Sequence, residues 1–319
     1  MAVYTKITLK LLKRLLKNYK LGILDDFHAI QEGVENTNYQ IITSKGKFIL
    51  TIFEKRVRDK DLPFFINLTK SLNNKGFKCP QPILDNNKKY INKILNKKCI
   101  ITSFLNGKKI IKINNIHCNE IGKQLSRLHF LSKNIKLYRK NNFGKSYWKK
   151  IFLNFSKTKK NPYNKIFEEI KIELFFLNKN WPKNLPSGII HADVFKDNVF
   201  FIKNNFSGLI DFYFSCNDYF AYELAICINA WCFDSKFNLN KSKAKKLISA
   251  YQKYRKLNSR EKKAFSILLR GAAMRFLLTR LNDIIYQPKN ALVAPHDPFE
   301  YYNILKYHQK NDITSSIII

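Results

Sequence analysis

Three oxygen-bearing side chains that suit phosphoryl transfer lie close together in the sequence. Asp193 precedes Asn198 by five residues, and Asp211 follows after a mainly apolar run. A carboxylate can orient an attacking hydroxyl, whereas an amide oxygen and a second carboxylate can hold a divalent cation that neutralises phosphate charge. These residue types in this order predict phosphoryl transfer from a magnesium nucleotide, with Asp193 as the base and the other two on the metal.

A predicted β-hairpin joins the two metal-binding candidates. Segments 199–202 and 206–210 are rich in aromatic and β-branched residues, and the Asn-Asn pair at 204–205 suits a two-residue turn. Such a turn places Asn198 opposite Asp211, where facing Cβ atoms lie roughly 5 Å apart. The order His-x-Asp-x4-Asn, then a hairpin and Asp, is also that of a kinase catalytic loop. The alternative is a surface turn in which the same polar side chains cap a helix or close an Asx-turn.

The composition describes a globular chain with a large positive charge. The 58 lysines and arginines against 23 acidic residues give a formal charge of +35, which attracts polyanions. The lysines are spread over the whole chain, however, with no arginine-rich tract and no aromatic RNA-binding motif. We therefore expect nonspecific polyanion binding and no specific nucleic-acid partner.

The cysteines and the N-terminus indicate a cytoplasmic protein. Six cysteines show neither C-x-x-C spacing nor a histidine at metal-ligand distance: Cys79, Cys99, Cys118, Cys216, Cys227 and Cys232. We expect reduced, buried thiols. The N-terminal segment lacks the apolar core of a signal peptide, and no apolar run is long enough to span a bilayer, so we expect no membrane partner. A basic amphipathic helix over 7–19 is expected to dock on the protein's own core rather than on a membrane surface.

The order of predicted elements indicates a two-part α+β fold. Strands are expected in the first third of the chain, over 27–33, 38–43, 47–54, 88–95 and 98–105, with one helix over 61–75. Helices dominate afterwards, over about 117–133, 163–179, 218–233, 241–256 and 259–286. We predict a two-lobe, protein-kinase-like fold with a small antiparallel β-rich lobe over 1–105 and a mainly helical lobe over 106–319. The Lys- and Asn-rich stretch 138–160 is expected to be mobile.

The first two predicted strands enclose a polar loop around Gly33, Asn36 and Asn38. A strand, a tight loop and a strand can lay backbone N–H groups over nucleotide phosphates. An ordinary hairpin is an equally good interpretation.

The last long helix carries two charges on one polar face. Arg275 and Asp283 lie eight residues apart in its sequence. A guanidinium and a carboxylate can hold the carboxylate and the ammonium of an amino-acid substrate. Salt bridges within the helix itself are the alternative.

With these residues in hand, the chain resembles the aminoglycoside-phosphotransferase and choline-kinase-like superfamily, and more closely its bacterial homoserine kinase branch. The segments that carry the likeness run nearly from end to end: EGVENTNY (32–39), GKFILTIFEKRV (46–57), DLPFF (61–65), CPQP (79–82), RLH (127–129), GIIHADVFKDNVFF (188–201), GLIDFYFSCND (208–218), AICINAWCF (225–233), RGAAMRFLLTRLND (270–283) and HDPFEYYNILKYHQ (296–309).

The resemblance implies ATP-dependent phosphorylation of the side-chain hydroxyl of L-homoserine, in threonine biosynthesis. Carried over position by position, it makes Asp193 the catalytic base and Asn198 and Asp211 ligands of Mg²⁺. His191 shapes the catalytic loop.

The resemblance also implies that the backbone of Ser103, Phe104 and Leu105 meets adenine, as the hinge does in kinases. One departure concerns the phosphates. Many kinase-like proteins have Lys or Arg where this chain has Thr51, and the helix over 61–75 has no Glu to pair with such a cation. Either a shifted cation among Lys55, Arg56 and Arg58 replaces it, or the pair is absent.

Two other functions stay open. A related kinase acting on choline, an aminoglycoside or methylthioribose would share the catalytic loop. A noncatalytic nucleotide or polyanion binder would use the positive charge instead. The sequence leaves the oligomeric state, monomer or dimer, undecided.

Overall fold

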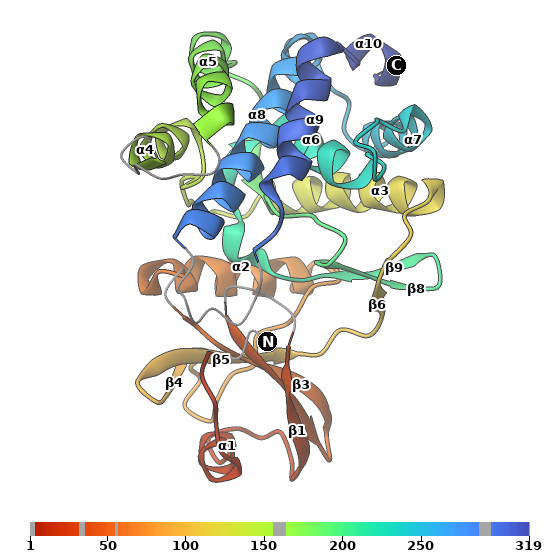
Figure 1. Ribbon diagram of the computed structural model, residues 1–319. Coiled ribbons are helices and arrows are strands. Elements are labelled where there is room, and N and C mark those ends of the chain that lie inside the picture. Colours follow the sequence, from red (N-terminus) through yellow and green to blue (C-terminus); the bar gives the residue numbers. More distant parts are fainter. Residues whose placement is uncertain (1–3, 32–35, 55–56, 156–163, 287–294, 319) are drawn as a thin grey trace. The chain divides into compact units, whose positions relative to one another are not determined.

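The computed structural model describes residues 4–31, 36–54, 57–155, 164–286 and 295–318. The chain divides into two compact units (Figure 1). The N-terminal unit contains Met1–Gly107, Ser207–Tyr213 and Asn290–Ala294, and the C-terminal unit contains Lys108–Phe206, Phe214–Lys289 and Pro295–Ile319. We predicted a boundary between residues 105 and 106, whereas the units divide after Gly107 and the short segment Ser207–Tyr213 joins the N-terminal unit.

A five-stranded antiparallel sheet organises the N-terminal unit, in the order β1-β2-β3-β5-β4. The strands are β1 (Leu24–Ile30), β2 (Thr37–Thr43), β3 (Gly46–Ile52), β4 (Asn92–Ile94) and β5 (Lys97–Ser103). Along β2, buried and half-buried residues alternate, as a strand with one face on a core requires. The predicted helix after β3 is α2 (Leu62–Asn74), which follows a 3-10 turn over Asp59–Asp61.

The expected N-terminal amphipathic helix is α1 (Leu9–Leu16). The side chain of Thr8 caps it by accepting a hydrogen bond from the N–H of Leu11, 3.3 Å away. Three leucines of the helix are buried in the core of the sheet: Leu12, Leu15 and Leu16. The helix therefore docks on the protein's own core, as predicted.

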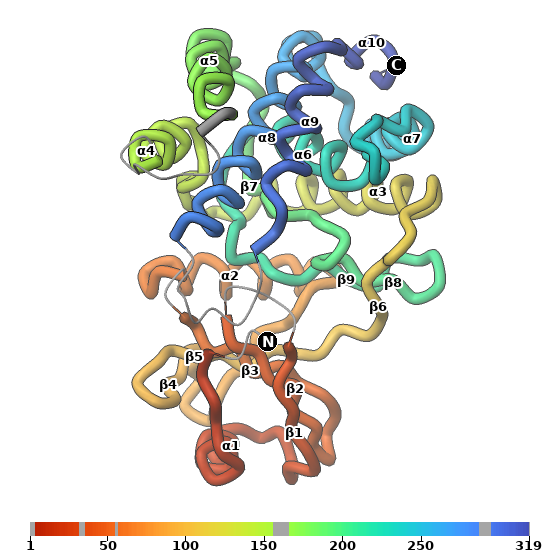
Figure 2. The backbone as a smooth tube through the Cα atoms, in the orientation of Figure 1, coloured from red at the N-terminus to blue at the C-terminus, as the bar shows by residue number. Residues whose placement is uncertain are grey.

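The C-terminal unit is mainly helical (Figure 2). Its helices are α3 (Asn115–Ser132), α4 (Lys145–Phe155), α5 (Asn164–Asn180), α6 (Phe220–Trp231), α7 (Lys241–Gln252), α8 (Ser259–Ile285), α9 (Pro298–Lys310) and α10 (Thr314–Ile317). Helix α3 packs on α7, and α8 packs on α6 and runs beside α9 (Figures 1 and 2). None of the helices in the described part of the chain is long and apolar enough to cross a membrane.

Short strands lie between these helices in the sequence. They flank the residues that were predicted to be catalytic or metal-binding. Strand β7 (Ser187–Ile190) pairs antiparallel with β10 (Cys216–Tyr219). A second small sheet has the order β6-β8-β9, with β6 at Lys108–Lys109, β8 at Val199–Ile202 and β9 at Asn205–Leu209. The predicted hairpin is therefore β8 and β9.

The hairpin turn lies one residue earlier than predicted. Its two residues are Lys203 and Asn204, and Lys203 has a φ of +56°. A two-residue turn at this place puts Phe201 opposite Phe206, and their rings are 6.4 Å apart. The expected pairing of Asn198 with Asp211 rested on the later turn, so that register was wrong.

The prediction that 138–160 is mobile was also wrong for the part that forms α4. Trp148, Ile151 and Phe155 are buried at i, i+3 and i+7 of this helix. The indole N–H of Trp148 donates to the carbonyl of Phe143 at 2.7 Å. The many Lys and Asn residues hid a short apolar stripe of helical period.

Candidate active site

The predicted base lies in the loop between β7 and β8, within the C-terminal unit. His191, fully buried, accepts a hydrogen bond at Nδ1 from the N–H of Asp193, 3.2 Å away. The side-chain N–H groups of Asn198 donate to Asp193 twice, to carboxylate Oδ2 and to the backbone carbonyl, both at 2.9 Å. The structure thus brings Asp193 and Asn198 together. Because Nδ2 of Asn198 faces Asp193, its Oδ1 remains as the oxygen that can bind a cation.

Glu223 holds the loop just before the base. This fully buried carboxylate, on α6, accepts a hydrogen bond at Oε1 from the N–H of Ala192, 2.6 Å away. Ala192 has a φ of +68°, a left-handed conformation that costs an ordinary residue about 1 kcal/mol. The conformation persists because its surroundings hold it.

A buried network in turn holds Glu223. Oε2 of Glu223 lies 2.6 Å from Nε2 of His129, whose Nδ1 lies 2.8 Å from the hydroxyl of Tyr251. Burial lowers the pKa of His129, although the bond to Glu223 opposes this effect. A neutral imidazole satisfies both contacts if Nε2–H donates to Glu223 and Nδ1 accepts from Tyr251.

Sequence reasoning gave no role to two members of this network, His129 and Tyr251. The available signal was the RLH segment (127–129), one of the segments that carry the family resemblance. It identifies His129 but none of its partners.

The residue after the base is also fixed. The indole N–H of Trp231 donates to the carbonyl of Val194 at 2.7 Å. The ring of Phe195 packs on that of Phe276, on α8, at a centroid distance of 4.8 Å. The loop is therefore held on both sides of Asp193.

The third member of the predicted triad, Asp211, belongs to the N-terminal unit. It follows β9 and has a φ of +61°. Nearby Tyr213 packs edge-on against Phe53 and Phe65, at centroid distances of 5.2 and 5.6 Å. Burial and the charge of Asp211 raise the pKa of Tyr213.

Thr51, at the position of the usual kinase cation, is buried in the same unit. Its hydroxyl donates to Oδ1 of Asn38 at 2.8 Å, and it is also a hydrogen-bond partner of Tyr213. Asn36 is buried and accepts a hydrogen bond from the N–H of Glu54, 3.3 Å away. Gly33 lies outside the described residues.

Of the candidate replacements for the phosphate-binding cation, one is described and is hydrogen-bonded within its own unit. Arg58 donates through Nε and Nη2 to Oδ2 of Asp61, at 3.0 and 2.8 Å. Lys55 and Arg56 lie outside the described residues.

The predicted hinge lies at the end of β5 and beyond it. The N–H of Ser103 donates to the carbonyl of Gln81 at 2.8 Å, and that of Phe104 to the carbonyl of Lys47 at 3.3 Å. In the described part of the chain, no hydrogen bond engages the backbone of Leu105. Of the three backbone N–H groups, that of Leu105 is the one without a hydrogen-bond acceptor among the described residues.

The two predicted substrate residues lie on α8. Arg275 is 1% exposed, so it does not belong to an open polar face as we expected, and no described acid pairs with it. Asp283 is half-buried. Eight residues of helix separate the two by about 12 Å. The joint binding of one amino acid by these two residues stays a prediction.

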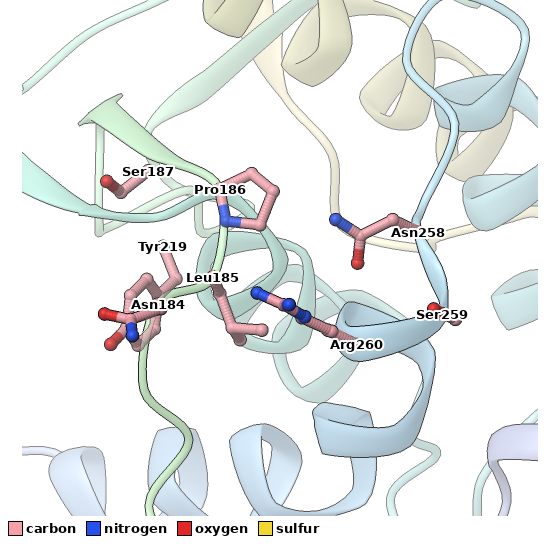
Figure 3. Close-up of a pocket in the computed structure, with 8 residues that line it drawn as sticks. All are labelled: Asn184, Leu185, Pro186, Ser187, Tyr219, Asn258, Ser259 and Arg260. Atoms are coloured by element: carbon pink, nitrogen blue, oxygen red, sulfur yellow. The ribbon is translucent and has the colours of Figure 1, made fainter.

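A hollow of 680 Å³ lies elsewhere in the C-terminal unit, near the start of β7 and the start of α8 (Figure 3). Its lining residues are Asn184, Leu185, Pro186, Ser187, Tyr219, Asn258, Ser259 and Arg260. None of the predicted catalytic, metal-binding or substrate residues lines it.

Comparison with known proteins identifies the family. The profile of the phosphotransferase enzyme family matches residues 26–257. The chain belongs to the phosphotransferase enzyme family. The resemblance seen in the sequence and the predicted enzyme class are thereby confirmed.

Curated relatives resemble the chain over almost its whole length. The homoserine kinase of Bartonella henselae is 44% identical over 306 residues, which cover 96% of each chain. The homoserine kinase of Xanthobacter autotrophicus is 42% identical over 312 residues, covering 98% of this chain and 97% of the relative.

Solved structures confirm the fold. An amicoumacin kinase superposes with a TM-score of 0.71 at 14% identity, covering 94% of this chain and 92% of its own. A choline kinase of Cryptosporidium parvum superposes with a TM-score of 0.68 at 14% identity, covering 95% of each chain. The predicted α+β, protein-kinase-like fold is therefore correct.

Proposed function

We propose that the protein is an ATP-dependent homoserine kinase, which transfers the γ-phosphoryl group of ATP to the side-chain hydroxyl of L-homoserine. The observation that carries the proposal is that hydrogen bonds fix the loop on both sides of Asp193. It is supported by relatives that match almost the whole chain and are named homoserine kinases. Fold likeness to choline and amicoumacin kinases supports small-molecule phosphorylation but does not select the acceptor.

In this proposal Asp193 orients the acceptor hydroxyl and accepts its proton as the bond to phosphorus forms. The hydrogen bonds from Asn198 keep the carboxylate in one orientation. Positioning of this kind supplies much of the acceleration in phosphoryl transfer.

Oδ1 of Asn198 and the carboxylate of Asp211 are the proposed protein ligands of Mg²⁺. Amide and carboxylate oxygens are the donors that this cation prefers. Bound with ATP, magnesium would neutralise charge on the phosphates. The proposal draws on the chemistry of these donors and on the family likeness, since the hairpin register no longer supports the pair.

On the nucleotide side, we propose that the backbone of Leu105 binds adenine, with Ser103 and Phe104 fixing its position. The loop at Gly33, Asn36 and Asn38 remains the proposed phosphate-binding segment. In this proposal Thr51 stabilises the sheet and does not bind the phosphates, because its hydroxyl donates a hydrogen bond to Asn38.

We further propose that the enzyme works in the cytoplasm on L-homoserine and ATP, with no specific nucleic-acid partner and no membrane partner. All six cysteines are free and buried, as predicted. Burial raises the pKa of the thiols of Cys79, Cys99 and Cys216 to about 12, so these groups are poor nucleophiles. A monomer and a dimer both fit the proposal.

The decisive test is the turnover of Asp193→Asn in an assay of ADP formation with L-homoserine, ATP and Mg²⁺. We expect turnover to fall at least about a hundredfold, because the variant cannot accept the proton. The matched control is Asp197→Asn, which makes the same change at an exposed position of the same loop. Near-normal turnover of Asp193→Asn would show that Asp193 is not the base. A wild-type enzyme that prefers choline to homoserine would show that homoserine is not the acceptor.

A further inference from the structure

Arg275 is the exception among the three arginines in the middle of α8, Arg270, Arg275 and Arg280. Arg270 donates to Glu173 at 2.7 Å, and Arg280 donates to Glu300 at 2.6 Å. Arg275 is 1% exposed, yet its Nε and Nη1 have no hydrogen-bond partner among the described residues. The hydroxyl of Tyr222 is a hydrogen-bond partner of the same side chain. A buried guanidinium with unused donors is unfavourable, and an apolar side chain would serve a purely structural role better.

Aromatic rings surround this cation. The guanidinium carbon of Arg275 lies 4.7 Å from the ring centre of Phe276, 5.4 Å from that of Phe143 and 5.9 Å from that of Phe214. Rings stabilise the charge and fix the plane of the guanidinium, but they accept no conventional hydrogen bonds. The guanidinium is therefore fixed in place while its Nε and Nη1 donors remain unused.

Asp218, an acid whose charge interacts with that of Arg275, has its own partners. Its Oδ2 accepts from Asn141 at 2.6 Å, and its Oδ1 accepts from the N–H of Tyr219 at 2.7 Å. Asp218 and Arg275 interact electrostatically, but no ion pair joins them. Asp218 thus reduces the cost of burying the charge without occupying the donors.

The Arg275 site and the catalytic loop share one aromatic cluster within the C-terminal unit. Phe276 contacts Phe195, which lies two residues after the base, and it also lies 5.1 Å from the ring of Tyr301. The hydroxyl of Tyr301 is buried and has no partner among the described residues. Burial is the main cause that raises the pKa of this phenol, and the charges of Asp193 and Arg275 are among those that act on it.

We propose that Arg275 binds the α-carboxylate of the amino-acid acceptor while the acceptor's hydroxyl faces Asp193. The inference rests on the proposed function and deepens it by naming a residue that determines specificity. Homoserine has its carboxylate at one end and its hydroxyl at the other. The aromatic cluster that contains Phe276 and Phe195 connects Arg275, proposed for the carboxylate, with Asp193, proposed for the hydroxyl. A buried donor set of this kind rejects an acceptor that lacks the carboxylate, because the guanidinium then stays unpaired.

The test compares L-homoserine with L-homoserine amide, which keeps the hydroxyl and the amine but loses the negative charge. With the wild-type enzyme we expect kcat/KM for the amide to be at least about a hundredfold lower. In Arg275→Met the ratio of kcat/KM for homoserine to that for the amide should shrink to within about threefold. The change should come from a lower kcat/KM for homoserine and not from a higher one for the amide. Arg275→Lys should retain part of the preference, since it keeps the charge without the planar fork.

The matched control is Arg270→Met, which removes a cation from the same helix but one that is already paired with Glu173. We expect lower stability and an unchanged preference for homoserine over its amide. If Arg275→Met does not fold, the wild-type comparison and Arg275→Lys still decide. Equal use of acid and amide by the wild type, or a preference that survives in Arg275→Met, would overturn the inference. A wild type that turns over neither would instead overturn the proposed function.

Discussion

Asp193 owes its position to the residues on either side of it. The N–H of Ala192 donates to Glu223, and the carbonyl of Val194 accepts from Trp231. Because Ala192 is left-handed, the backbone would relax if its partner were lost. We therefore expect Glu223 to act by positioning Asp193, the proposed base.

Glu223→Gln tests this role. An amide has one oxygen, whereas the carboxylate accepts hydrogen bonds from both Ala192 and His129. We expect the free energy of unfolding to fall by about 2 kcal/mol, as for a lost hydrogen bond to a buried charge. We expect kcat to fall roughly tenfold to a hundredfold, with KM for ATP unchanged, because the base is displaced.

Urea unfolding and steady-state kinetics measure the two effects. Glu168→Gln is the control, because that side chain is 76% exposed on α5. A Glu223→Gln enzyme that loses stability but keeps its kcat would show that the carboxylate supports only the fold.

At the scale of elements, the packing of α3 on α7 brings His129 and Tyr251 together. The two helices approach closely because α3 has Gly122 at the contact. A Cβ at this position would lie 2.0 Å from the backbone carbonyl oxygen of Leu247. Backbone atoms within a helix cannot move aside as a flexible side chain can, so the glycine sets the helix separation.

Gly122→Ala should therefore lower the free energy of unfolding by about 1–3 kcal/mol, despite the better helix propensity of alanine. Gly144→Ala is the matched control, because a Cβ there would have its nearest neighbour at 3.8 Å. Thermal unfolding of both variants measures the difference. Equal melting temperatures would contradict the close approach of α3 and α7.

At the scale of the whole molecule, the residues proposed for catalysis and binding come from both units. Asp193, Asn198 and Arg275 belong to the C-terminal unit, whereas Asp211 and Leu105 belong to the N-terminal unit. The formal charge of +35 is spread over both units.

This spread charge predicts polyanion binding that is strong at low salt and independent of sequence. Affinity for a fluorescent RNA should fall linearly on logarithmic axes as salt rises, because counterions are released on binding. RNAs of unrelated sequence should give the same curve, and Asp193→Asn should bind as the wild type does. Selective binding of one sequence at high salt would contradict a nonspecific role for the charge.

The sequence by itself determined the fold class and the family, and it predicted the order of the proposed catalytic residues. Apolar periodicity located α1, α2 and α8 to within a few residues, because burial of one face is a local pattern. The same reasoning failed at α4, where polar residues diluted the pattern. It also misplaced the hairpin turn by one residue, because two adjacent polar pairs, Lys203-Asn204 and Asn204-Asn205, can each form a turn.

Tertiary structure alone decided how the site is held. His129 and Glu223 are 94 positions apart, and His129 and Tyr251 are 122 apart, so no local pattern connects them. The burial of Arg275 is equally hidden, because its helical period also fits an exposed salt-bridged face. Side-chain period is set by local backbone geometry, whereas partners are set by the packing of distant helices.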